Sequence, residues 1–180
     1  MKHEISGGYM ELTVRVIIAD DHPTVLLGIK HALVAGKTID VVGMAKNSHE
    51  LIRMLAVEEC DVLVTDYSMP GGDYGDGLPL LGLIQRSHPH LHIVVMTMMD
   101  NPALLKTLLK NGVRCLVHKS DDVMHLIPAV HAAHAGGQYL SPAITAMQHL
   151  FNRDCPLDPG LLSCTSPVCP GYARISNGYH

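Results

Sequence analysis

The stretch DVLVTDYSMPGG, residues 61–72, joins an apolar segment to an acidic loop. Residues 62–65 read Val-Leu-Val-Thr without alternation of apolar and polar side chains, which is the pattern of a strand covered on both faces. Asp66 closes this segment, and Met69-Pro70 followed by two glycines favours a turn. The stretch therefore predicts a buried strand with a carboxylate at its carboxyl end.

Four other apolar segments, rich in Val and Ile, have the same character, at residues 14–19, 39–45, 92–97 and 113–119. Segments with apolar residues at helical spacing alternate with the strands, at 24–35, 48–58, 78–87, 102–110 and 125–135. Repeated β-then-α units imply a parallel sheet with right-handed crossovers and helices on both faces. The expected fold class is therefore α/β, with a doubly wound sheet.

Local signals mark the ends of these elements. Asn47 and Glu50 stand where a capping box would begin the helix at 48–58, and Pro128 fits the last helix if that helix starts near His125. We expect a flexible leader at 1–12, one domain at 13–137, and a linker or short helix at 138–152. Residues 153–180 are rich in Pro, Gly, Ser and Cys without periodicity, so we expect a disordered tail there.

Composition narrows the class of protein. The net charge is −4 and no run of Lys or Arg occurs, so no dedicated nucleic-acid surface is indicated. The leader lacks an apolar core, which argues against a signal peptide, and no run of about 18 apolar residues predicts a membrane span. Five cysteines without paired spacing fit reduced thiols, so we expect a cytoplasmic protein.

Polar side chains stand at the carboxyl ends of the predicted strands, where sites form in sheets of this kind. These side chains are Asp20, Asp21, Asp66, Thr97 and Lys119. Crowded carboxylates repel one another unless a cation neutralises them, and Mg²⁺ suits such oxygen donors. An ionised aspartate can itself attack phosphorus, while a lysine and a hydroxyl stabilise the transferred group. The set therefore suits phosphoryl transfer onto a carboxylate.

Two other interpretations of the loop after Asp66 fail. A calcium loop counted from Asp66 would have Pro70 at its fifth position and Gly77 where a bidentate glutamate is needed. A phosphatase of the haloacid-dehalogenase type needs a second aspartate two residues on, and Ser68 is there. Asp73 and Asp76 are accordingly expected to be turn or cap residues.

Four short motifs in this order resemble the receiver domains of response regulators. They are IIADDHP at 17–23, DYSMPGG at 66–72, VVMTM at 94–98 and VHKS at 117–120. ADDHP, SMPG followed by YGDG, and TMMDNPA are similar to the NarL/FixJ group, and within it to the Rcs capsule-phosphorelay regulators. The resemblance implies a flavodoxin-like (CheY-like) sheet of five strands in the order 2-1-3-4-5 with five helices, and it identifies 13–137 as the receiver domain.

The resemblance also implies roles for the residues at the strand ends. Asp66 would accept the phosphoryl group from a histidine kinase or a histidine phosphotransfer protein, and Thr97 and Lys119 would contact that group. The Mg²⁺ ligands that it implies are Asp21, Asp66 and the backbone carbonyl of Ser68, with Asp20 acting mostly through water. The chain would then be no enzyme, apart from phosphotransfer onto its own aspartate.

Three departures from the family pattern leave a second hypothesis open. Leu116 stands where many receivers have a switching aromatic residue, and Met98 stands where many have a small one. The helix-turn-helix that follows in this group is not visible after Pro142, so we expect no direct DNA binding and no membrane contact. The alternative is a module that pairs with another response regulator, as a homodimer or heterodimer partner, without phosphorylation.

Overall fold

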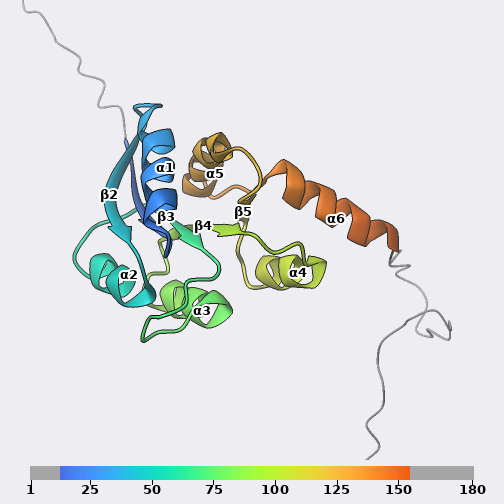
Figure 1. The fold of residues 1–180 in the computed structure, drawn as a ribbon, viewed down its shortest axis with the longest axis horizontal. Coiled ribbons are helices and arrows are strands. Elements are labelled where there is room, and N and C mark those ends of the chain that lie inside the picture. Colours follow the sequence, from blue (N-terminus) through green and yellow to red (C-terminus); the bar gives the residue numbers. More distant parts are fainter. Residues whose placement is uncertain (1–12, 155–180) are drawn as a thin grey trace, which may run out of the picture.

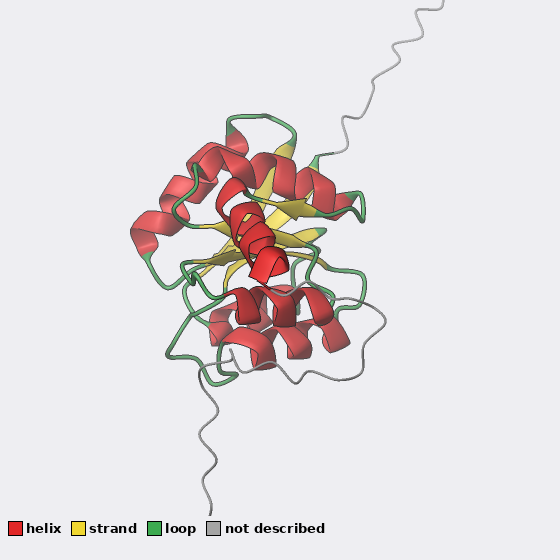
Figure 2. Ribbon diagram, turned by 90° about the vertical axis from the view of Figure 1, so that its right-hand side faces the viewer, coloured by secondary structure: helices red, strands yellow, loops and turns green. Residues whose placement is uncertain are grey.

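A computed structural model describes residues 13–154 of the chain, which form one parallel sheet between two layers of helices (Figures 1 and 2). The strands are β1 (Val14–Ala19), β2 (Ile39–Ala45), β3 (Val62–Asp66), β4 (His92–Thr97), β5 (Cys115–His118) and β6 (Tyr139–Leu140). The helices are α1 (Pro23–Val34), α2 (Ser48–Leu55), α3 (Gly77–Ser87), α4 (Pro102–Lys110), α5 (Leu126–His134) and α6 (Pro142–Asp154), with a 3₁₀ turn η1 (Val123–His125).

The predicted fold class and strand order are confirmed, with one addition at the edge. Within residues 13–154 the order is β2-β1-β3-β4-β5-β6, so six strands replace the expected five and six helices replace five. The extra strand pairs Tyr139 with Cys115 and Leu140 with Leu116. Two residues are too few to show an alternating or continuous apolar pattern, which is why the sequence did not reveal this strand.

The region beyond residue 137 is more ordered than a linker. Of the linker or short helix expected at 138–152, the helix is present as α6, and its Ile144 is buried in the core. The expected leader at 1–12 and nearly all of the expected disordered tail, with the question of DNA binding that depends on it, lie outside the described residues. Among residues 13–154, no helix is long and apolar enough to cross a membrane.

Two apolar clusters fill the space between the sheet and its helices. Val16 and Ile18 of β1 face α1 and α5, whereas Ile17 and Ala19 face the layer that holds α2, α3 and α4. Residues on both faces of β1 therefore pack against helices, which explains the continuous apolar runs of the central strands. Figure 2 shows the strands between the two helical layers.

The predicted caps are present with one variation. Asn47 Oδ1 accepts the Glu50 backbone N–H at 2.9 Å, but Glu50 Oε2 accepts the N–H of Lys46 rather than that of Asn47. At the other predicted boundary, η1 runs directly into α5 and places Pro128 in the first turn of that helix. The sequence therefore located both helix starts to within one or two residues.

The loop between β3 and α3 makes a tight turn that closes beside Asp66. Gly77 has a φ of 59° and donates its N–H to the carbonyl of Tyr67 at 2.9 Å. Gly72 lies so close to α2 that an added Cβ would be 1.8 Å from Ser48 Oγ. Asp76 is the N-cap residue of α3, and Asp73 is exposed, with His49 Nδ1 2.9 Å from its carboxylate. Both carboxylates thus belong to the turn and the helix start, as predicted.

Candidate functional site

The polar residues at the strand ends gather at one edge of the sheet. Asp20 follows β1, Asp66 ends β3, Thr97 ends β4 and Lys119 follows β5. Because all these strands are parallel, their carboxyl ends lie on the same side of the molecule. The fold therefore brings together residues that are up to 99 positions apart in the chain.

Lys119 joins two carboxylates that come from different strands. Its Nζ donates to Asp20 Oδ2 at 2.7 Å and to Asp66 Oδ2 at 2.6 Å. The Asp20 side chain is fully buried, and those of Asp66 and Lys119 are 9% and 15% exposed. Charges so far from water need partners, and here one ammonium group serves both carboxylates.

The site perturbs the proton affinity of both partners. Burial raises the pKa of Asp66, the nearby Lys119 opposes this, and the charge of Asp20 adds to the rise. Burial lowers the pKa of Lys119, but its contacts with Asp20 and Asp66 outweigh that effect and leave the pKa above the ordinary value. Lys119 is therefore a cation at neutral pH, and Asp66 holds its proton more tightly than an exposed aspartate does.

Asp21 has an oxygen that suits a metal ion. Asp21 Oδ1 is buried and accepts no hydrogen bond within residues 13–154, although His22 Nδ1 lies 2.8 Å from it without the required alignment. Ligand atoms of Asp20, Asp21 and His22 lie within 4.8 Å of one another. Carboxylate oxygens of this kind are what Mg²⁺ prefers, so the residues present fit that ion. The sequence contained His22 in its ADDHP motif, but His22 had not been singled out.

Thr97 enters the site mainly through its backbone. It is 3% exposed, its carbonyl accepts the Lys119 N–H at 2.8 Å, and its Oγ1 accepts the N–H of Met99 at 3.0 Å. A hydroxyl that accepts in this way keeps its own hydrogen free to donate. The expected contact of Thr97 with a phosphoryl group stays a prediction.

Ser68 lies two residues after Asp66 on the exit loop. Its N–H is 3.4 Å from Asp66 Oδ1, and its hydroxyl donates to Asp76 Oδ2 at 3.3 Å. The part of its carbonyl in metal binding stays a prediction. Asp66 Oδ1 is thus held only by a long contact, whereas Asp66 Oδ2 is held by Lys119.

Two of the three departures from the family pattern, Leu116 and Met98, lie in different surroundings. Leu116 is fully buried in the cluster that contains Leu108 of α4 and Ile144 of α6. Met98 follows Thr97 and is 64% exposed. Leu116 therefore serves as a core residue, while Met98 presents an apolar side chain beside the site.

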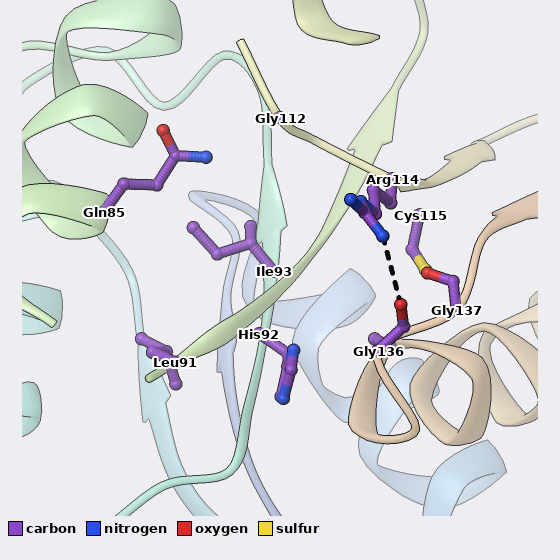
Figure 3. A pocket seen from close by; sticks show the side chains of 10 residues that line it. Gln85, Leu91, His92, Ile93, Gly112, Arg114, Cys115, Gly136 and Gly137 are labelled. Atoms are coloured by element: carbon purple, nitrogen blue, oxygen red, sulfur yellow. Dashed lines mark hydrogen bonds between the residues drawn. The ribbon is translucent and has the colours of Figure 1, made fainter. Parts of the chain in front are cut away.

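A separate hollow of about 270 Å³ lies at the amino ends of the strands, where β4 and β5 begin (Figure 3). His92, Arg114 and Gly136 line it, and Arg114 Nη1 donates to the carbonyl of Gly136 at 3.3 Å. Burial raises the pKa of the Cys115 thiol, which also lines it. This hollow is far from the carboxylates and holds no group that phosphoryl transfer needs.

Known proteins match the region that forms this site. Residues 16–131 match the response regulator receiver domain family. The transcriptional regulatory protein RcsB of Escherichia coli (strain K12) is 39% identical over 134 residues, which are 74% of this chain and 62% of RcsB. The oxygen regulatory protein NreC of Staphylococcus carnosus is 32% identical over 132 residues, which are 73% of this chain and 60% of NreC. The chain thus spans about three fifths of these curated relatives.

Solved structures show the same similarity. The isolated REC domain of RcsB from Salmonella enterica serovar Typhimurium, with the phosphomimetic BeF3⁻, matches with a TM-score of 0.71 and 38% identity, covering 75% of this chain and 98% of that one. A structure of two RcsB dimers bound to two parallel DNAs matches with a TM-score of 0.72 and 38% identity, covering 76% of this chain and 68% of that one. The family match at residues 16–131 includes every strand end described above.

Proposed function

Because the chain belongs to the response regulator receiver domain family, we propose that it is a phosphorylatable switch whose Asp66 accepts a phosphoryl group from a phosphohistidine donor in the presence of Mg²⁺. The family is that of two-component response regulators, and its curated relatives include transcription regulators. The observation that carries the proposal is the contact of Lys119 with both Asp66 and Asp20, next to a buried oxygen of Asp21 that accepts no hydrogen bond within residues 13–154.

Asp66 Oδ1 is the oxygen that we assign as nucleophile, because Lys119 does not hold it. It would attack phosphorus while the bond from phosphorus to the donor's histidine nitrogen breaks. The imidazole keeps the electron pair of that bond and takes a proton from water, and Asp66 becomes an aspartyl phosphate. Lys119 then offsets the negative charge on the phosphoryl oxygens, and the Thr97 hydroxyl donates a hydrogen bond to one of them.

Mg²⁺ would be held by Asp21, Asp66 and the carbonyl of Ser68, with Asp20 acting through water. Bound there, it neutralises charge as the phosphoryl group is transferred. The buried Asp21 Oδ1 supports this assignment, since it can bind a cation without giving up an aligned hydrogen bond, and its one short contact is with the ring of His22. We propose no catalysed reaction beyond transfer onto Asp66.

The donor that we propose is a histidine kinase or a histidine phosphotransfer protein, and the compartment is the cytoplasm. Phosphorylation would bias the loop between β4 and α4 and so change affinity for a partner. Since RcsB dimers have been solved on DNA, we propose that this chain pairs with a second copy or with another response regulator. With a net charge of −4, direct DNA contact is not part of the proposal.

The test is phosphorylation by a small-molecule donor. Wild type incubated with Mg²⁺ and phosphoramidate is expected to gain one phosphoryl group by intact mass, and Asp66→Ala to gain none. Asp73→Ala is the matched control, because it removes an exposed aspartate from the same loop. Undiminished labelling of Asp66→Ala, or no labelling of wild type, would contradict the proposal.

The alternative is pairing without phosphorylation, and exposed apolar side chains favour it. Leu27 and Met98 are 63% and 64% exposed, and Val123 is 39% exposed. A partner that covers such side chains removes apolar surface from water, and this lowers the free energy of the complex. A pull-down with another response regulator that is equally strong for wild type and Asp66→Ala would support this alternative over the phosphorylated switch.

A further inference from the structure

His118 is a buried histidine that phosphoryl transfer, as described above, does not use. It is the last residue of β5, is 4% exposed, and directly precedes Lys119. In the sheet it pairs with Thr97, the last residue of β4. Its own N–H donates to Ser141 Oγ at 2.9 Å, which fixes its backbone from the other side. The ring is therefore held where the strand of the lysine meets the strand of the threonine.

The contacts of the ring define where its proton lies. Ser120 donates its backbone N–H to His118 Nδ1 at 3.2 Å, and Ser120 Oγ lies 2.6 Å from the same nitrogen. A nitrogen that accepts an N–H bond carries no proton of its own, so the neutral ring has its hydrogen on Nε2. His118 therefore presents a buried donor toward the loop between β4 and α4.

Asp100 of that loop offers the acceptor. Asp100 Oδ1 lies 3.2 Å from His118 Nε2, and the Asp100 side chain is 81% exposed. The two groups are not aligned as a hydrogen bond, and within residues 13–154 Nε2 has no other hydrogen-bond partner. A buried donor without an acceptor is costly, so His118 favours loop arrangements that keep the Asp100 carboxylate near it.

The same loop orients the Thr97 hydroxyl. Met99, the residue before Asp100, donates its N–H to Thr97 Oγ1 at 3.0 Å. Asn101, the residue after Asp100, caps α4 by accepting the N–H of Ala103 at 2.9 Å. Asp100 thus lies between the contact that orients Thr97 and the contact that begins the helix. If Asp100 moved away, the Met99 contact would loosen with it.

We propose that His118 is a positioning residue, which acts through Asp100 to fix the β4–α4 loop so that the Thr97 hydroxyl is oriented to donate to a phosphoryl oxygen on Asp66. The proposal has two halves. The catalytic half, the effect on phosphoryl transfer, rests on the proposed function. The structural half, the fixing of the loop, can be measured in unphosphorylated protein. A hydroxyl held in place before the reaction needs no reorganisation when charge develops.

The structural half is tested by amide hydrogen exchange of Met99 in the full chain, measured by NMR without phosphodonor. Asp100→Ala is expected to speed this exchange about fivefold, the factor that loss of a polar contact worth about 1 kcal/mol gives. Asp100→Asn keeps an acceptor oxygen and is expected to remain close to wild type. Asp73→Ala removes a similar aspartate–histidine contact elsewhere, with His49, and is expected to leave Met99 unchanged.

The catalytic half is tested by the rate of labelling with phosphoramidate and Mg²⁺. Asp100→Ala is expected to slow labelling by about the same fivefold factor, while Asp100→Asn labels at nearly the wild-type rate. If Asp100 acts through Thr97, adding Asp100→Ala to Thr97→Ala should slow labelling no further. A general loss of stability would instead slow labelling in both backgrounds alike.

Three results separate the possibilities. Met99 exchange in Asp100→Ala equal to that of wild type would overturn the inference, and so would an equal slowing of labelling with and without Thr97. If wild type takes no phosphoryl group but Asp100→Ala still speeds Met99 exchange, the proposed function fails and the fixing of the loop through Asp100 stands.

Discussion

The ammonium group of Lys119 lies 2.6 Å from Asp66 Oδ2, although the two residues are 53 positions apart in the chain. The same group lies 2.7 Å from Asp20 Oδ2, so Lys119 connects the ends of three strands: β1, β3 and β5. The contacts of Lys119 thus hold three strand ends together, in addition to any part they have in phosphoryl transfer. The stability of the site therefore depends on which of these charges are present and on what neutralises them.

Replacing Lys119 with an apolar side chain of similar length should destabilise the fold. Lys119→Met leaves two buried carboxylates without a cation, which we expect to cost about 2–4 kcal/mol at pH 7 by urea unfolding. At low pH the carboxylates are protonated, so the difference from wild type should shrink. Lys30→Met, at an exposed position of α1, is the control and should change stability by less than about 0.5 kcal/mol. Equal losses of stability in the two variants would contradict the role of Lys119 in holding the three strand ends together.

Replacing Asp66 with asparagine should not weaken the fold at neutral pH. The folded state raises the pKa of Asp66, so it binds a proton more tightly than the unfolded chain does. The stability from that proton is complete below the unfolded pKa of about 3.9 and is lost as pH rises through the folded pKa. Asp66→Asn imitates the protonated form. We expect its Tm at pH 7 to equal or exceed that of wild type by about 2–4 °C.

The pH dependence provides the check on that expectation. As pH falls below the unfolded pKa of about 3.9 the wild-type carboxyl becomes protonated in both states, so the two Tm values should converge there. A Tm for Asp66→Asn well below that of wild type at pH 7 would mean that the ionised carboxylate stabilises the fold. Asp73→Asn, at an exposed position, should follow wild type throughout.

Magnesium should stabilise wild type more than a variant that lacks the carboxylate charge of Asp21. If Asp21 Oδ1 binds the ion, Mg²⁺ at about 100 times its Kd adds about 2.7 kcal/mol to the free energy of unfolding. Asp21→Asn should lose most of this gain, and EDTA should abolish it in wild type. Thermal unfolding with and without Mg²⁺ measures both effects. A full Mg²⁺ response in Asp21→Asn would remove Asp21 from the ligand set.

The close approach of Gly72 to α2 should make the loop after Asp66 intolerant of any side chain. An added Cβ would lie 1.8 Å from Ser48 Oγ, so Gly72→Ala is expected to destabilise the fold by about 1–3 kcal/mol. Ser48→Gly in the same chain should recover part of the loss. Gly28→Ala is the matched control, because an added Cβ there meets nothing within 4 Å and α1 should gain about 0.5–1 kcal/mol. Equal effects at the two glycines would contradict the contact.

The sequence predicted the sheet well because its strands are buried on both faces. Continuous apolar runs such as residues 62–65 predict strands that are covered on both faces. The parallel order of these strands then places Asp20, Asp66, Thr97 and Lys119 at one edge of the sheet. What the sequence did not reveal depends on contacts between side chains. No spacing rule shows that one lysine serves two carboxylates, or that His118 lies 3.2 Å from Asp100.

Short elements were the other source of error. The strand Tyr139–Leu140 has no period of its own and forms only because β5 offers an unpaired row of backbone groups. The reciprocal bond of the capping box went to Lys46 because Glu50 extends one residue further back than the pattern assumes. In both cases the neighbouring backbone decided the outcome rather than the local residue types.

The strand β6 also protects the sheet from other copies of the chain. All four residues of β5 are buried and three of them are apolar, so without β6 a largely apolar strand would form the border of the sheet with its peptide groups unpaired. Such borders recruit strands from neighbouring molecules and lead to aggregates. With only two residues, β6 offers little template of its own. A fragment that ends at residue 137 is therefore expected to self-associate. The shortest fragment that stays monomeric should extend through α6.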